Sequence, residues 1–302
     1  MKKRYVKLRP VQVVDRIFKY LSITVMIVYA ISLLIPLFWM LYSSIKPADE
    51  FLLSPYAFPK KLQFSNYVEV LSKLEYRRTK EGVGLVVYGL GDMFLYSIVW
   101  SIATPLIANF FNMLTSYVVC KYKFPGRNFI YSLGIFLMVI PIIGTGPASL
   151  RIHKALGLYD NFLGRILISG SGAFYGFNFI LMYGAWKGIP WAYAEASFID
   201  GSSNIRTFFH VMMPLMIPTF MVTFILGFLS TWNDYLTFLT WLPSYPNLAL
   251  GMYMFQYNIK LYGLGVPTIL AGFTITAIPT AVLYLFSQKT IMTKMNVGGL
   301  KG

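Results

Sequence analysis

The sequence predicts an all-α polytopic membrane protein, because long charge-free apolar runs alternate with charged segments along almost the whole chain. Of the 302 residues, 57% are hydrophobic and only 12% are charged, whereas soluble domains carry about 25% charged residues. A helix needs about 20 apolar residues to cross a bilayer, and one charge at its centre costs about 2.5–3.5 kcal/mol on insertion scales. Six runs meet both conditions and predict six transmembrane helices: 21–43, 93–120, 129–150, 166–186, 211–233 and 261–288.

The first run follows a basic N-terminal arm, residues 1–20. Lysine and arginine favour the cytoplasmic side of a membrane and attract anionic lipids, so the arm is expected in the cytoplasm. The run is too long for a removable signal peptide and lacks a small-residue cleavage site, so it is expected to remain as a span. The basic residues of the arm are Lys2, Lys3, Arg4, Lys7, Arg9, Arg16 and Lys19.

If the arm is cytoplasmic and each of the six runs crosses the membrane once, the topology of the whole chain follows. It places both termini in the cytoplasm and makes 21–288 the transmembrane domain, followed by a cytoplasmic tail, 289–302. The short loop 121–128 is densely basic, as a cytoplasmic loop should be. The loop 187–210 also falls inside, whereas 44–92, 151–165 and 234–260 fall outside.

Residues 235–259 are also free of charge and long enough to span. Pro243 and Pro246 interrupt them, and three amide side chains add polarity. A break of this kind favours an outer hairpin or a re-entrant segment buried against protein. A seventh span, which would place the tail outside, remains the alternative. The amides are Asn247, Gln256 and Asn258.

Several functions are excluded by residues that the sequence lacks or separates. The net charge of +15 is spread over the loops rather than over one soluble face, so no nucleic-acid partner is expected. Cys120 is the single cysteine, which excludes an internal disulfide. His153 and His210 fall on opposite sides of the predicted membrane, so no metal site is expected. The sequence also lacks a phosphate-binding Gly-x-x-x-x-Gly-Lys-Ser/Thr loop and a catalytic Gly-x-Ser-x-Gly motif, and no catalytic residue is predicted.

A short polar island inside the loop 187–210 predicts a helix, a turn and a second helix. Pro190 suits the first turn of a helix over residues 191–199. Gly201 permits the positive φ that ends such a helix, and one residue of 202–204 is expected to cap the next one, which continues into the fifth span. The spacing of i, i+3 and i+4 places Ala192, Glu195, Ala196 and Ile199 on one face.

This island resembles the "EAA" loop of binding-protein-dependent ABC importers. The matching residues are Glu195-Ala196-Ser197, with Ser197 at the second alanine position, then Asp200-Gly201, and then Phe208, Pro214 and Pro218. The tail, from Ser287 to Thr290 and from Gly298 to Gly302, is similar to that of the carbohydrate (maltose-type) branch. A helical loop between any two spans is the simpler alternative, but it does not account for the register of these residues.

The resemblance implies a permease subunit of an ATP-driven sugar importer in the bacterial cytoplasmic (inner) membrane, which is not an enzyme. The loop would be a coupling helix that docks on an ATPase. The implied partners are a homologous second permease, two ATPase subunits and an extracytoplasmic solute-binding protein. ATP and Mg would be bound by the ATPase, so this chain carries no cofactor. The expected coupling residues are Ala192, Glu195, Ala196, Ser197, Ile199, Asp200 and Gly201.

Neutral polar and aromatic residues within or beside the apolar runs are candidates for a sugar pathway, since sugars combine hydroxyl groups with apolar ring faces. Interhelical hydrogen bonds and an aromatic interface belt are the alternative reading. An ATP-independent channel or secondary transporter would explain the spans but not the polar island, and it remains the alternative function. The candidate pathway residues are Asn109, Asn112, Asn178, Trp232, Asn233, Asp234 and Tyr235.

Overall fold

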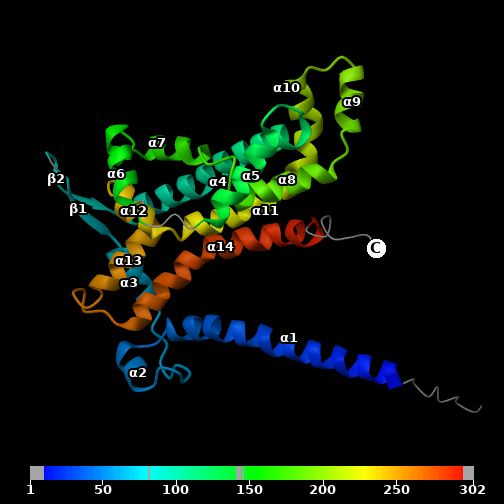
Figure 1. The fold of residues 1–302 in the computed structure, drawn as a ribbon. Coiled ribbons are helices and arrows are strands. Elements are labelled where there is room, and N and C mark those ends of the chain that lie inside the picture. Colours follow the sequence, from blue (N-terminus) through cyan, green and yellow to red (C-terminus); the bar gives the residue numbers. More distant parts are fainter. Residues whose placement is uncertain (1–9, 81, 141–143, 145, 295–302) are drawn as a thin grey trace, which may run out of the picture. The chain divides into compact units, whose positions relative to one another are not determined.

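The computed structural model describes residues 10–80, 82–140, 144 and 146–294, which form a mostly helical chain (Figure 1). The chain divides into two compact units. The first comprises Met1–Lys73 and Ile259–Ile275, and the second comprises Leu74–Asn258 and Thr276–Gly302. The first nine residues of the basic N-terminal arm and the glycine-rich end of the tail, residues 295–302, lie outside the described residues.

The first unit contains α1 (Pro10–Ser43), α2 (Ala48–Leu53), α3 (Ser65–Lys73) and the beginning of α14 (Val266–Lys294). The mean hydropathy reaches 2.4 in the most apolar 18-residue stretch of Val14–Ser43, and none of the residues in that stretch is buried. Helices that are apolar all round are found in hydrophobic surroundings. The exposed apolar side chains of α1 therefore fit a helix whose neighbours are lipid chains.

Polar contacts fix the turn that follows α1. The buried Asn66 of α3 donates to the carbonyl oxygens of Ser44 (2.8 Å) and Lys46 (2.9 Å). Lys46 is itself fully buried, and its Nζ donates to the carbonyl oxygen of Ser54 at 3.0 Å. Buried polar groups need such partners, so these bonds hold the chain in one conformation where it leaves the helix.

The second unit begins with a β-hairpin, which the all-α prediction did not include. Strands β1 (Tyr76–Lys80) and β2 (Gly84–Tyr88) are antiparallel, with Tyr76 opposite Tyr88. Gly82 in the turn between them and Gly84 at the start of β2 adopt φ +76° and +91°, a conformation that glycine adopts readily. A two-stranded hairpin is marginal by itself in water, so this one depends on its contacts with the rest of the unit.

The long helix α4 (Leu90–Lys121) is the centre of the second unit. It packs against α8 (Phe177–Gly188) and α11 (Met213–Trp232). A Cβ atom added to Gly227 of α11 would lie 2.7 Å from the Cβ of Pro105, so glycine is needed for this close approach. Within this unit, the hairpin lies near one end of α4, and α9 (Ala192–Ile199) and α10 (Asn204–Thr207) lie near the other (Figure 1). We call these the hairpin end and the elbow end.

Four of the six predicted spans are continuous helices in the structure. Each is long and apolar enough to cross a membrane. They correspond to the predicted runs 21–43, 93–120, 211–233 and 261–288. Their bounds are Val14–Ser43, Leu90–Lys121, Asn204–Trp232 and Val266–Gln288.

The other two predicted runs do not form single unbroken helices. In 129–150, α5 (Arg127–Val139) ends early and α6 (Gly146–Ala155) begins a new helix, with Gly144 between them at φ +84°. In 166–186, α7 (Phe162–Leu167) and a 3₁₀ turn, η1 (Ile168–Gly170), precede α8, with Gly176 at φ +90°. Glycines in the left-handed region interrupt both runs, and charge-free length alone does not reveal this.

The ambiguous segment 235–259 is divided as its prolines predict. It forms α12 (Tyr235–Trp241) and α13 (Leu248–Asn258), and both prolines, Pro243 and Pro246, lie in the connection. The buried Asn247 joins the two helices, because its Nδ2 donates to the carbonyl oxygen of Asp234 and its Oδ1 accepts from the amide of Leu250. The break is confirmed, whereas its side of the membrane remains a prediction.

Candidate functional site

The polar island folds as a short helix, a tight turn and a second helix, which we call the elbow (residues 191–207). Helix α9 ends at Ile199, and Gly201 adopts φ +82° in the turn. The amide of Ser202 donates to the carbonyl oxygen of Ser197 at 3.0 Å, which closes the end of the helix. Ser203 then caps α10, since its hydroxyl accepts from the amide of Arg206. The predicted helix, glycine turn and cap are all confirmed.

The two faces of α9 differ in exposure. Ala192, Glu195, Ala196 and Ile199 are all exposed, and the Ile199 side chain is 86% exposed. In the described part of the chain, the face predicted from the spacing is therefore open to solvent. The exposed Ile199, which follows the small Ala192 and Ala196 on this face, offers an apolar contact that another protein can cover.

Two carboxylates accompany this exposed face. Glu195 and Asp200 are exposed, and neither side chain makes a hydrogen bond or ion pair with the part of the chain that the structure describes. Within the described residues, these carboxylates therefore do not hold the elbow together. Their position suits contacts with a partner.

Ser197 lies on the opposite, buried face of α9 and does not share the surface of Glu195. Its side chain is 8% exposed, and its Oγ shares a hydrogen bond of 3.0 Å with Oγ1 of the fully buried Thr207 in α10. This bond joins the two arms of the elbow. An alanine at position 197, as in the motif, would leave the Thr207 hydroxyl without this partner.

Aromatic and methionine side chains attach the elbow to the helices beneath it. Trp186 of α8 is fully buried, and its Nε1 donates to the carbonyl oxygen of Met113 in α4 at 3.1 Å. The ring of Tyr117 lies 4.9 Å from the rings of both Trp186 and Phe208. Ala194 of α9 belongs to the same cluster. Sequence reasoning identified Phe208 through the motif but missed Trp186 and Tyr117, which lie far from it in the chain.

A π-helical turn, η2 (Phe208–Met212), connects the elbow to α11. Wider turns of this kind are frequent at functional sites, because they change the direction of side chains within a continuous helix. Phe208 and Met212 are buried in the elbow cluster, whereas His210 is exposed. From the second arm of the elbow, Asn204–Trp232 therefore runs as one continuous helix through η2 and α11.

The predicted pathway residues separate into two groups. The first lies in the interior, where Asn178 of α8 donates through Nδ2 to Oδ1 of Asn109 at 3.0 Å. Asn112, one turn farther along α4, donates to the carbonyl oxygen of Ala108 at 2.7 Å. Asn109 Nδ2 and Asn112 Oδ1 are buried and find no hydrogen-bond partner among the described residues. These amide atoms can therefore form further hydrogen bonds inside an apolar bundle.

The second group, residues 232–235, serves several structural roles. Trp232 is buried, and its Nε1 donates to the carbonyl oxygen of Thr276 at 3.1 Å. Asp234 caps α12 by accepting from the amide of Thr237. Asn233 is exposed and donates to the carbonyl oxygen of Leu229.

Tyr235, the last of this group, forms an exposed aromatic pair. Its ring stacks on that of Tyr253 with centroids 4.6 Å apart, and the two side chains are 37% and 41% exposed. Tyr253 was not predicted, because its partner becomes a neighbour only through the pairing of α12 with α13.

A polar network around Asp160 holds the hairpin end. The Asp160 carboxylate accepts from the amide and the hydroxyl of Ser244, at 2.8 and 2.6 Å. Arg78 of β1 reaches both residues, with Nη1 3.2 Å from Ser244 Oγ and 3.7 Å from Asp160 Oδ2. Asp160 also adopts φ 53°, and its amide donates to the carbonyl oxygen of Trp241. Three segments distant in sequence are joined here.

Arg165 adds a further contact at this end. Its guanidinium lies 4.8 Å from the centre of the Trp241 ring, a geometry typical of a cation–π interaction. Burial lowers the pKa of Arg165, whereas the negative charge of Asp234 raises it. In the described part of the chain, no three His, Cys, Asp or Glu side chains form a group that could hold a metal ion.

The comparison with known families identifies the family of this chain. The profile of the family described as "Binding-protein-dependent transport system inner membrane component" matches residues 112–292, which include the elbow, α11 and most of α14. The chain belongs to this family. It is therefore a multi-pass component of a bacterial inner membrane, and the family works with a binding protein and ATPase subunits.

Several relatives with known names match this chain over almost its whole length. The diacetylchitobiose uptake system permease protein of Streptomyces coelicolor is 25% identical over 94% of this chain and 89% of its own. In Bacillus subtilis, an arabinooligosaccharides transport system permease protein is 28% identical over 89% of this chain and 91% of its own. A galactooligosaccharides transport system permease protein of that organism is 27% identical over 99% of this chain and 98% of its own. All three are named as transport permeases and not as enzymes.

A solved structure shows the same fold. One chain of a bacterial ABC transporter involved in the import of the acidic polysaccharide alginate matches with a TM-score of 0.74 and 23% identity. The match covers 95% of this chain and 99% of that chain. The fold of a membrane permease is thereby confirmed.

Proposed function

We propose that this chain is a permease subunit of an ATP-driven ABC importer for a sugar or oligosaccharide that a solute-binding protein delivers. The family membership supports the importer, and the relatives that carry oligosaccharides support the substrate class. The observation that carries the mechanism is the elbow. It presents an exposed face to a partner on one side and packs into α4, α8 and η2 on the other.

The proposed topology has six crossings with both termini in the cytoplasm. Four crossings are the continuous helices described above. The third and fourth would be made by the broken runs 129–150 and 166–186, whose short helices follow one another along the chain. The domain bounds remain the arm 1–20, the transmembrane domain 21–288 with its coupling loop 187–210, and the tail 289–302.

In this proposal the exposed face of α9 docks on an ATPase subunit. Ala192 and Ala196 allow a close approach, Ile199 supplies the apolar contact, and Glu195 and Asp200 supply polar contacts. Ser197 and Gly201 hold the elbow in shape rather than touching the partner. Closure of the ATPase pair would move α9, and the continuous path through η2 would carry that movement into α11. Such a movement shifts an equilibrium between inward-facing and outward-facing states.

The proposed assembly contains a homologous second permease, two ATPase subunits and a solute-binding protein. ATP and Mg bind to the ATPase, so no cofactor is assigned to this chain. The interior asparagines Asn109, Asn112 and Asn178 are proposed to line the solute pathway, because amides exchange hydrogen bonds with sugar hydroxyls. Residues 232–235 are proposed to contribute at the mouth, where the Tyr235–Tyr253 pair offers an aromatic surface for a sugar ring.

Copurification of the tagged chain from its own membranes tests the proposal. The expected companions are a second permease and a phosphate-loop ATPase. Gly201→Pro should lose the ATPase while the chain still inserts, because proline cannot adopt the φ of +82° at this position. Gly188→Ala is the matched control, since that glycine has no positive φ and no atom within 4 Å of an added Cβ. A chain that purifies alone and conducts solute without ATP would instead be a channel or secondary transporter.

A further inference from the structure

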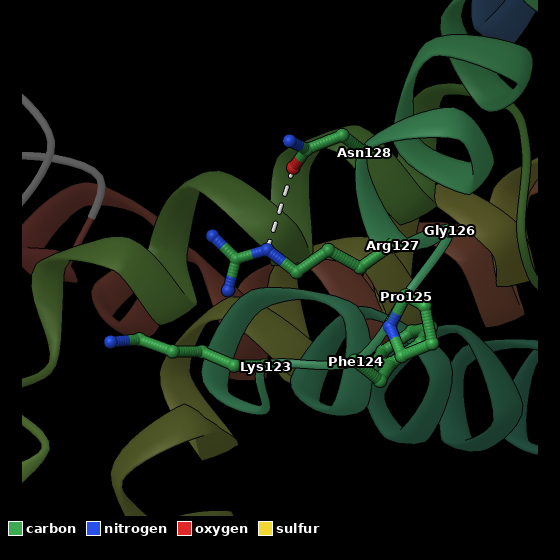
Figure 2. Close-up of a pocket in the computed structure, with 6 residues that line it drawn as sticks. All are labelled: Lys123, Phe124, Pro125, Gly126, Arg127 and Asn128. Atoms are coloured by element: carbon green, nitrogen blue, oxygen red, sulfur yellow. Dashed lines mark hydrogen bonds between the residues drawn. The ribbon is translucent and has the colours of Figure 1, made fainter.

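The loop between α4 and α5 forms an open hollow of about 460 Å³, which we call the basic hollow. It is lined by the six consecutive residues Lys123–Asn128. Figure 2 shows that the side chains of Lys123 and Arg127 extend to the same side of the loop. Their two charged groups therefore offer a joint site for an anion.

No carboxylate neutralises these cations among the described residues. Lys123 is exposed, and none of the ion pairs in the described chain includes Lys123 or Arg127. Arg127 donates only weakly to neutral oxygens, through Nη1 to the Tyr122 carbonyl at 3.3 Å and through Nε to Asn128 Oδ1 at 3.4 Å (Figure 2). Its remaining N–H groups are free to bind an anion, and a guanidinium binds phosphate in a bidentate manner.

A third cation lies on the neighbouring helix. Lys187 of α8 is placed 5.0 Å from the Tyr183 ring and 5.9 Å from the Tyr131 ring. The two rings stack with centroids 4.3 Å apart and so join α8 to α5. The positive charge at this end of α5 therefore extends beyond the loop itself, which strengthens attraction for an anion.

The position of the hollow favours a lipid over a dissolved anion. It directly follows the apolar helix α4, so it lies where a membrane-spanning segment ends. Helix α5 then exposes apolar side chains, with Phe129 68% exposed and Phe136, two turns farther on, 58% exposed. An acyl chain can follow this face while its phosphate remains at the loop. A free phosphate ion would gain the charge contacts but none of the apolar ones.

The hollow is also connected to the elbow. Tyr122, whose carbonyl oxygen accepts from Arg127, packs its ring edge-on against Trp191 with centroids 5.6 Å apart. Its hydroxyl donates to Asn204 Oδ1 at 3.4 Å. A molecule in the hollow would therefore lie next to the element that carries the proposed coupling movement.

We propose that the basic hollow binds the phosphate of an anionic phospholipid headgroup, with an acyl chain of that lipid along the Phe129–Phe136 face of α5. The site uses Lys123 and Arg127 for charge and the exposed apolar residues of α5 for anchoring. It does not depend on which solute the protein carries.

Native mass spectrometry of the purified chain, together with the subunits that accompany it, tests this site. Phosphatidylglycerol and phosphatidylcholine are titrated separately. The protein should retain phosphatidylglycerol in preference, and Lys123→Gln/Arg127→Gln should weaken that binding by roughly 25-fold, at about fivefold for each cation removed near a membrane surface. The matched control is Lys60→Gln/Lys61→Gln, which removes the same charge from two exposed lysines of the first unit and should change nothing.

Two further measurements separate the lipid from other occupants. Phe129→Ser should weaken phosphatidylglycerol binding, and millimolar inorganic phosphate should not displace the lipid. Displacement by phosphate would show a free-anion site and overturn the proposal. Equal binding by the double variant and the unchanged protein would also overturn it, as would a purified complex that takes up no phosphatidylglycerol because a subunit covers the loop.

Discussion

The two ends of the second unit are held together by different forces. The elbow end relies on a buried cluster of aromatic and methionine side chains with one hydroxyl pair, and its carboxylates are left exposed. At the hairpin end, the carboxylate Asp160 is the centre of directional bonds to Ser244 and Arg78. Apolar packing is non-directional, so the elbow can shift as a body while breaking few directional bonds, such as the long one from Tyr122 to Asn204. The network at the hairpin end fixes loops in one arrangement.

Trp186→Ala should have the largest effect, because it removes the largest fully buried side chain from the elbow cluster. Truncation of a buried tryptophan costs about 3–5 kcal/mol of stability. The midpoint of thermal unfolding in detergent should fall steeply and ATPase recovery should fall with it. Trp186→Phe keeps most of the packing and is the control. A loss equally small for both variants would show that this cluster does not hold the elbow.

Asp160→Ala should be next, with a loss of about 2–3 kcal/mol for several hydrogen bonds to a charged group. The amide of Ser244 and the guanidinium of Arg78 would lose their acceptor. Asp200→Ala at the elbow is the matched control and should stay within about 0.5 kcal/mol, as exposed substitutions do. Thermal unfolding of the two variants measures the comparison directly. Equal losses would contradict the distinction between the two ends.

Gly201→Ala should destabilise the elbow by about 1–2 kcal/mol, the cost of a left-handed backbone for a residue with a Cβ. No atom lies within 4 Å of the added Cβ, so the effect would come from the backbone alone. The measurement is the amount of solute transported per ATP hydrolysed, which should decrease in Gly201→Ala. Gly188→Ala should leave this ratio unchanged, and a matching decrease in both variants would argue against a special role for Gly201.

Ser197→Ala should have the smallest effect, about 1 kcal/mol for one hydrogen bond. A double-mutant cycle with Thr207→Val isolates the pair, since only their direct interaction makes the two losses non-additive. Thermal unfolding and transport per ATP should both show this coupling. Strictly additive losses would mean that the hydroxyl pair does not join α9 to α10.

Local features of the candidate site were predictable from the sequence. The helix predicted over 191–199, the positive φ of Gly201, a cap within 202–204 and the shared face with Glu195 all follow from torsion preferences and spacing within a few residues. The structure selects Ser203 as the cap. The four continuous apolar helices follow from length and composition in the same way. These features are set by residues that are neighbours in the chain.

The tertiary structure decided the rest. The bonds of Ser197 with Thr207, Asn178 with Asn109 and Asp160 with Ser244 join residues that only packing makes adjacent. The breaks in the runs 129–150 and 166–186 coincide with glycines at positive φ, which the charge-free pattern does not single out. Composition and periodicity identify a membrane helix and its free face, because both are local properties. They do not identify pairs of distant residues, since a buried polar group can be satisfied by many partners and only the packed fold selects one.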